Sequence, residues 1–146
     1  MHIDNLSDDD IARILRETRV IALVGASPKP DRPSHRVGTF LAQQGYKVIP
    51  VNPGQAGKTL FGETCVASLA DISEPVDMVD IFRRTEKVMG VVEEALHVLT
   101  GLKTIWMQLD IVDDKAAALA HAQGAEVVMD RCPAIEIPRL GISQVA

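Results

Sequence analysis

Short runs of apolar residues alternate along the chain with longer segments in which apolar positions recur at helical spacing. The apolar runs are four or five residues long, which is typical of strands buried on both faces of a sheet. We predict strands at residues 20–24, 47–51, 78–82, 104–107 and 126–129. The intervening segments predict helices at 34–44, 86–99 and 113–123 and a shorter helical turn within 64–72.

A further helix is expected before the first strand. The stretch LSDDDIARILRE places Ser7 at an N-cap, puts acidic residues in the first turn, and spaces Ile11, Ile14 and Leu15 along one face. Repeated strand–helix order favours a parallel sheet with right-handed crossovers. We therefore predict an α/β, Rossmann-like, doubly wound parallel five-stranded sheet with helices on both faces, plus an N-terminal helix.

Length and composition fit this fold as one domain. The chain has 146 residues, of which 47% are hydrophobic and only 3% aromatic, so aliphatic residues must build the core. We predict a single domain over residues 1–146, with the N-terminal helix within 1–18 and the Rossmann-like core over 19–146. No repeat or long linker indicates a second domain.

Charge and cysteine content exclude several classes of protein. The net charge of -5 disfavours nucleic acid as a partner, because such proteins need a basic surface. No apolar run is long enough to cross a membrane, and no apolar leader opens the sequence. The two cysteines, Cys65 and Cys132, match no metal-ligand spacing, so a reducing cytoplasm is the expected location.

The turn after the first predicted strand lacks the usual dinucleotide fingerprint. Gly25 ends that strand, but the next glycine, Gly38, lies well inside the following helix. Asn52 also stands at the end of the second strand, where an NAD site has an acidic residue. An ordinary NAD dehydrogenase is therefore disfavoured.

The loop GASPKPDRPSHR is a local concentration of positive charge in an acidic chain. It has Lys29, Arg32 and Arg36 against one acid, Asp31, and its prolines precede a helix whose first amide groups would face an anion. The candidate phosphate-binding residues of this loop are Ser27, Lys29, Arg32, Ser34, His35 and Arg36. Basic loops also occur for solubility alone, but open α/β sheets bind ligands at this position.

The other strand ends carry side chains suited to the same ligand. Asn52 follows the second strand, Phe82 and Arg83 the third, and Gln108 the fourth. Phe82 offers an apolar face, the arginine a phosphate contact and the amides polar contacts. Each has a plainer interpretation, as a core aromatic or a solvated helix start.

Catalytic chemistry is harder to find. None of the four histidines pairs with another histidine or a cysteine at metal-ligand spacing, so we predict neither a metal site nor catalytic residues. Cys132 is the one candidate nucleophile, because Arg131 precedes it and a helix-starting proline follows. A buried, inert cysteine is the stronger interpretation, since no base is identifiable.

The segments VGASPKPDRPSHRVGTFL, YKVIPVNP, DIFRR, IWMQ and DRCPAIEIPRL together resemble the small bacterial and archaeal CoA-binding proteins that consist of one Rossmann-like domain. The resemblance covers nearly the whole chain from the first strand onward. It implies coenzyme A (CoA) or an acyl-CoA as the ligand.

This family is similar in fold to the CoA-binding domain of the succinyl-CoA synthetase α subunit. The resemblance implies that the cofactor lies against the turn after the first strand and the ends of the next three. The residues carried over are Gly25, Ala26, Ser27 and Pro28, then Asn52 and Pro53, Phe82 and Arg83, and Met107 and Gln108. The synthetase's ligase chemistry lies in a further domain, so the implied function is non-catalytic binding.

Two other functions stay open from the sequence. One is an enzyme, either an NADP-dependent oxidoreductase that uses Arg32 or Arg36 for the 2'-phosphate or a CoA-dependent transferase that uses Cys132. The other is a module that acts on a protein partner, with CoA as its regulator. If the chain self-associates, a homodimer is the expected form.

Overall fold

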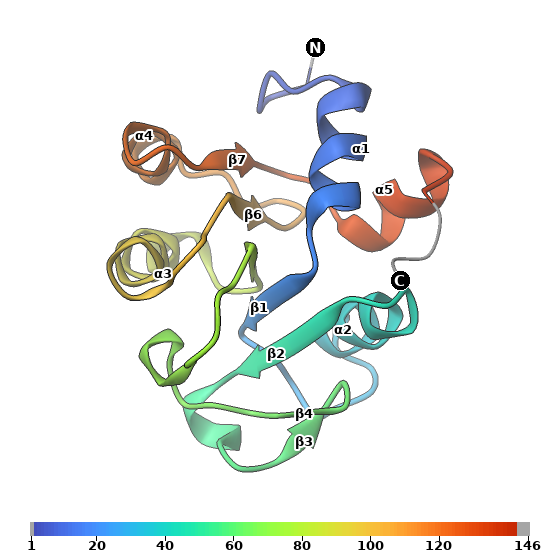
Figure 1. Ribbon diagram of the computed structural model, residues 1–146, viewed down its shortest axis with the longest axis vertical. Coiled ribbons are helices and arrows are strands. Elements are labelled where there is room, and N and C mark those ends of the chain that lie inside the picture. Colours follow the sequence, from blue (N-terminus) through green and yellow to red (C-terminus); the bar gives the residue numbers. More distant parts are fainter. Residues whose placement is uncertain (1, 143–146) are drawn as a thin grey trace.

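The computed structural model of the protein describes residues 2–142 and shows a five-stranded parallel sheet between two helical layers (Figure 1). The strands are β1 (Val20–Val24), β2 (Lys47–Val51), β5 (Met78–Ile81), β6 (Thr104–Met107) and β7 (Glu126–Val128). They are arranged in the order β2-β1-β5-β6-β7, and every neighbouring pair is parallel. The predicted fold class is confirmed. The domain predicted over 1–146 extends beyond the described residues at both ends.

Helices cover both faces of the sheet. The helices α1 (Asp8–Glu17), α2 (Pro33–Gln43) and α5 (Pro133–Arg139) lie on one side, and α3 (Thr85–Val98) and α4 (Asp114–Ala122) lie on the other (Figure 1). Successive strand residues alternate between the two layers, as the pleat of a strand requires. Leu23 and Trp106 pack toward the first layer, whereas Val24 and Ile105 pack toward the second.

The strand order creates a crevice at one end of the sheet. From β1 the chain runs outward to the edge strand β2 and then crosses back to β5, on the other side of β1. The connections from β1 and β5 therefore leave in opposite directions, and the carboxyl ends of these two strands border an open space. Open α/β sheets bind ligands at such switch points.

A small hairpin was not anticipated from the sequence. It consists of β3 (Thr59–Leu60) and β4 (Glu63–Thr64), which are antiparallel, and a 3-10 turn, η2 (Leu69–Asp71), follows. The Phe61 ring at the hairpin tip lies where a Cβ on Gly38 of α2 would be, so any other residue there would displace the ring. Segment 64–72 thus holds the expected helical turn only near its end.

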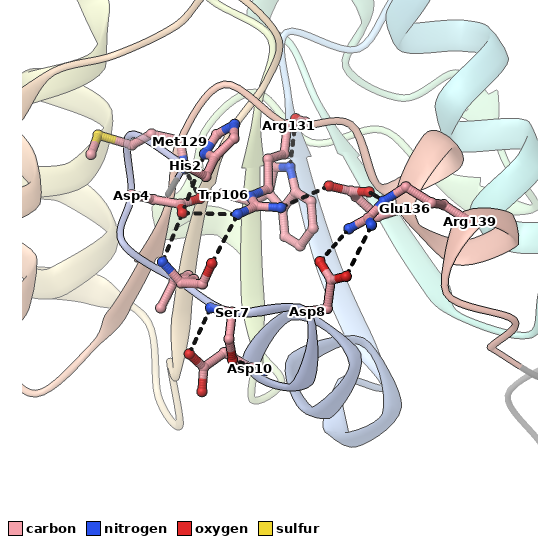
Figure 2. Close-up of polar contacts among 11 residues, drawn as sticks. His2, Asp4, Ser7, Asp8, Asp10, Trp106, Met129, Arg131, Glu136 and Arg139 are labelled. Carbon is pink, nitrogen blue, oxygen red and sulfur yellow. Dashed lines mark hydrogen bonds and ion pairs between the residues drawn. The ribbon is translucent and has the colours of Figure 1, made fainter.

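The N-terminal segment is attached to the loop between β7 and α5 (Figure 2). Arg131 is 6% exposed and donates hydrogen bonds to Asp4 at 2.8 and 3.0 Å and to Glu136 at 3.0 Å. Arg139 joins Glu136 to Asp8 in the first turn of α1. Helix α1 begins at the predicted Ser7 cap, which forms a capping box with Asp10.

Candidate functional site

A cavity of about 920 Å³ lies at the carboxyl ends of β1, β5 and β6. Its wall is formed by the loop after β1, the first turns of α2, and the segments that follow β2, β5, β6 and β7. This is the crevice that the strand order creates, and it is the expected position for a ligand in an open α/β sheet.

Most of the residues proposed from the sequence line this cavity. These are Gly25, Ser27, Pro28, Lys29, Arg32, Ser34, Arg36, Asn52, Phe82 and Gln108. Five do not line it: Ala26, His35, Pro53, Arg83 and Met107. The structure therefore brings together the glycine turn, the basic loop and three further strand ends.

Three of the five residues outside the wall have a structural role beside the cavity. Ala26 and Met107 are fully buried, so they pack in the core beneath the site. The Nδ1 atom of His35 lies 2.9 Å from the Ser27 carbonyl oxygen, and its ring contacts Phe61 with centroids 5.7 Å apart. His35 thus connects α2 to both the glycine turn and the hairpin.

Gly25 allows the close approach of β1 to β5 at the base of the cavity. Its φ is +91°, and a Cβ there would overlap the carbonyl oxygen of Phe82. The same Cβ would lie 3.1 Å from the Arg83 Cδ, so the Arg83 side chain passes beside this turn although it does not line the cavity. Only glycine satisfies both the backbone conformation and the space.

Asn52 holds the end of β2 against the glycine turn. Its Nδ2 donates to the Ala26 carbonyl at 2.7 Å, and its Oδ1 accepts from the Gly54 amide at 2.9 Å. Both ends of the side-chain amide are therefore engaged by the protein. Asn52 contributes to the cavity mainly as a support for the loop that carries the basic residues.

The wall formed by the loop after β1 is strongly basic. Lys29, Arg32 and Arg36 all line the cavity and are exposed, and Asp110 is the acidic residue of the wall. Arg36 Nη1 donates to the Asp31 carbonyl at 2.5 Å, which fixes the side chain along the loop. Helix α2 begins here, and Arg32 at its N-cap makes no side-chain cap. The open helix terminus adds to the attraction for anions.

A buried carboxyl lies behind the inner end of the cavity. Asp80 of β5 is fully buried, and its Oδ1 accepts a 2.9 Å hydrogen bond from Gln108 Nε2. Burial raises the pKa of Asp80 to about 7, and the hydrogen bond from Gln108 opposes the rise only in part. Sequence reasoning assigned no role to Asp80, because it sits within an apolar strand.

Cys132 lines the same end of the cavity, at the start of α5. Burial raises the pKa of its thiol, hydrogen bonds from the amides of Ala134 and Ile135 oppose the rise, and the charges of Asp80 and Glu136 raise it further. The neighbouring Arg131 is engaged by Asp4 and Glu136. The thiol is therefore protonated at neutral pH, as the interpretation of an inert cysteine predicts.

The apolar part of the wall was missed in the sequence. It comprises Val37, Phe40, Leu109, Ile111 and Ala134 in addition to Phe82. Helical spacing offered a signal for two of them, since Val37 and Phe40 share a face of α2 with Pro33 and Arg36. The cavity thus combines a basic mouth with an apolar wall, which suits an amphipathic ligand.

Residues 19–138 match the model of the CoA binding domain. The chain belongs to this CoA-binding family. YneT of Bacillus subtilis, an uncharacterized protein, is 38% identical over 130 residues, which cover 89% of this chain and 93% of YneT. Membership indicates a CoA-type ligand, and the basic and apolar walls of the cavity are compatible with one.

Solved structures in the same size range resemble this CoA-binding chain closely. A hypothetical protein from Pyrococcus horikoshii OT3 is 38% identical with a TM-score of 0.88, and the match covers 96% of each chain. Cell-free ID.343 from Thermus thermophilus is 38% identical with a TM-score of 0.87, covering 92% of this chain and 99% of the other. The five-stranded fold is thus shared over nearly the full length of these proteins.

Residues 2–142 hold neither a metal-binding cluster nor a helix that could span a membrane. No cluster of three or more His, Cys, Asp or Glu side chains is arranged to hold a metal ion there. Within the same range, every helix is too short or too polar to span a bilayer.

Proposed function

We propose that the protein binds CoA or an acyl-CoA in the cavity at the carboxyl ends of β1, β5 and β6, without catalysing a reaction on it. The observation that carries this proposal is the composition of the cavity wall in a chain that belongs to the CoA-binding family. Three basic residues from one loop line the same space as an apolar wall.

CoA matches this division of the wall. Its nucleotide end carries a pyrophosphate and a ribose phosphate, and its pantetheine arm is longer and largely uncharged. We assign the phosphates to the loop that holds Lys29, Arg32 and Arg36, where a helix terminus adds its dipole. The arm would then extend toward Phe82, Gln108 and the apolar wall.

The non-catalytic assignment is supported by the groups within reach of such a ligand. Cys132 supplies a thiol to the wall, and its raised pKa keeps that thiol in the weakly nucleophilic protonated form. Among the described residues, no histidine lines the cavity to serve as a base. Binding as a carrier, sensor or regulator fits this set of groups.

The cellular location and the oligomeric state are also part of the proposal. Both cysteines are free and buried, which accords with a reducing cytoplasm. We also expect any self-association to give a homodimer, which sedimentation velocity would detect.

Thermal unfolding in the presence of different nucleotides tests the proposal. A ligand that binds only the folded protein at a hundred times its Kd stabilises it by about 2.7 kcal/mol, which shifts the melting temperature clearly. We expect CoA and acetyl-CoA to raise the melting temperature and NAD to leave it unchanged. A shift with NADP alone would contradict the proposal and favour the oxidoreductase. Turnover of an acyl-CoA on mixing with the protein would support a transferase instead.

A further inference from the structure

Asp80 and Gln108 form a polar pair that crosses from the central strand to the cavity. Asp80 lies in β5, the middle strand, and pairs with Leu23 of β1 and Trp106 of β6 in the sheet register. Gln108 follows β6 two residues after Trp106, so its side chain lies on the same face. The 2.9 Å hydrogen bond from Gln108 Nε2 to Asp80 Oδ1 joins them.

The contacts around Asp80 do not give its carboxyl a stabilising role in the fold. Asp80 is 0% exposed, and its Oδ2 has no hydrogen-bond partner in the described structure. A buried carboxyl with one unsatisfied oxygen costs stability, and an apolar residue of similar size would avoid that cost. The position therefore favours a functional reason for the residue.

The pair determines which end of the Gln108 amide meets the cavity. Gln108 is only 5% exposed but lines the cavity, and its Nε2 points to Asp80. Its Oε1 accepts no hydrogen bond from the described residues and is not enclosed by the core. An ionised carboxylate only accepts hydrogen bonds, so it requires the NH₂ end of the amide and leaves the oxygen for the cavity.

We propose that Asp80 is a positioning residue for ligand recognition: it holds Gln108 with Oε1 toward the cavity, so that the inner end of the site selects a ligand N–H or O–H donor. This inference rests on the proposed CoA binding and deepens it. The donors of CoA at that end are the amide N–H groups and the hydroxyl of the pantetheine arm. The nucleotide end is held separately by the basic loop.

Ionisation of Asp80 gives this arrangement a pH dependence. A protonated carboxyl can also donate a hydrogen bond, and Gln108 can then bind it with either end of its amide. The preference for a donor should therefore strengthen as Asp80 ionises. Cys132 faces Asp80 from α5, and its thiol pKa is raised by burial and by the charges of Asp80 and Glu136, so it ionises at higher pH.

Two ligands distinguish the contribution of the pantetheine arm to binding from the contribution of the nucleotide. We would measure the Kd of CoA and of adenosine 3',5'-bisphosphate, which lacks the arm, by calorimetry. The proteins would be the wild type, Asp80→Leu, Gln108→Leu and the double variant. Leucine has the same number and branching of side-chain heavy atoms as aspartate and is compatible with the buried position. The bisphosphate affinity reports whether each variant retains the folded site.

We expect Asp80→Leu and Gln108→Leu each to weaken CoA binding about five- to tenfold, as the loss of one hydrogen bond implies. Binding of the bisphosphate should stay within about twofold of the wild type, because its contacts lie elsewhere. The double variant should bind CoA no more weakly than either single variant, because Asp80 acts through Gln108.

A pH series adds a readout that a merely structural role would not change. From pH 5.5 to 8.5, the preference of the wild type for CoA over the bisphosphate should rise relative to that of Asp80→Leu, which corrects for titration of the ligands. Three results would overturn this inference while leaving the proposed CoA binding intact. They are parallel pH profiles of the ligand preference in the wild type and Asp80→Leu, equal losses of affinity for both ligands in the variants, or an unchanged CoA affinity in Asp80→Leu. Failure of the wild type to bind either ligand would overturn the proposed CoA binding itself.

Discussion

Arg131 binds Asp4 through two parallel hydrogen bonds, from Nε at 2.8 Å and from Nη2 at 3.0 Å, although the two residues are far apart in the sequence (Figure 2). Both side chains are almost completely buried. Burial alone would raise the pKa of Asp4, but the hydrogen bonds from Arg131 and from the amides of Leu6 and Met129 outweigh it and lower the pKa. The pair therefore stabilises the fold above the ordinary pKa of a carboxyl and loses that effect as the pH falls through the lowered value.

Removal of this carboxylate should destabilise the protein strongly. We expect Asp4→Ala to lower the free energy of unfolding by on the order of 2–4 kcal/mol, because it leaves a buried guanidinium with Glu136 as its only charged partner among residues 2–142. Denaturant unfolding at neutral pH measures the change. Asp8→Ala is the matched control, since its carboxylate also binds an arginine but is 63% exposed, and it should have little effect. Equal effects of the two substitutions would contradict the prediction.

Asp80 should make the protein less stable as the pH rises. Because burial raises its pKa to about 7, the folded protein holds a proton between roughly pH 4 and pH 7 that the unfolded chain has released. From pH 5 to pH 8, this group should remove about 2–3 kcal/mol of stability. Asp80→Asn cannot ionise, so its stability relative to the wild type should increase over that interval. If the difference in unfolding free energy between the two proteins were the same at pH 5 and pH 8, Asp80 would stay ionised throughout.

The basic loop should distinguish CoA from dephospho-CoA. We expect CoA to bind more tightly, because it has one more phosphate for the residues Lys29, Arg32 and Arg36, and the difference should shrink at high salt. Arg36→Ala should narrow the difference by roughly 1.5–3 kcal/mol if the side chain contacts that phosphate. Lys115→Ala removes an exposed positive charge from α4, outside the cavity, and should leave the difference unchanged. Calorimetric titration with both ligands measures it, and equal affinities in the wild type would place the loop charges on another phosphate.

Cys132 should react slowly with alkylating reagents. Its raised thiol pKa predicts little thiolate at pH 7 and slower labelling than that of an unperturbed thiol at the same pH. Labelling of Cys65→Ala with iodoacetamide isolates this thiol, and Cys132→Ala isolates the other buried cysteine for comparison. Rapid labelling of Cys132 at pH 7 would revive the interpretation as a transferase nucleophile.

The sequence predicted the sheet because its signals are local. Each strand is a short apolar run, and the start of α1 depends on Ser7 and residues within one turn of it. The hairpin was missed because two-residue strands have no periodicity, and its anchor, Phe61 against Gly38, is a tertiary contact.

The candidate site was likewise predicted where its signals are local and missed where they depend on tertiary contacts. The glycine turn and the strand-end residues could be located because ligands in this fold class meet the carboxyl ends of strands. Asp80 could not, since its importance depends on Gln108, which follows the neighbouring strand β6. Asn52 and His35 were assigned to the ligand by position, but their hydrogen bonds to the backbone of the glycine turn show that they also brace it.

The attachment of the first residues to Arg131 has a practical consequence. The Arg131 carbonyl accepts the indole N–H of Trp106, and the next residue, Cys132, forms part of the cavity wall. A purification tag that displaces residues 2–6, or a shortened protein that begins at α1, would remove Asp4 from Arg131 and loosen that wall. Affinities measured on such a protein would then describe a damaged site, so ligand assays require a protein in which Asp4 keeps its contacts with Arg131.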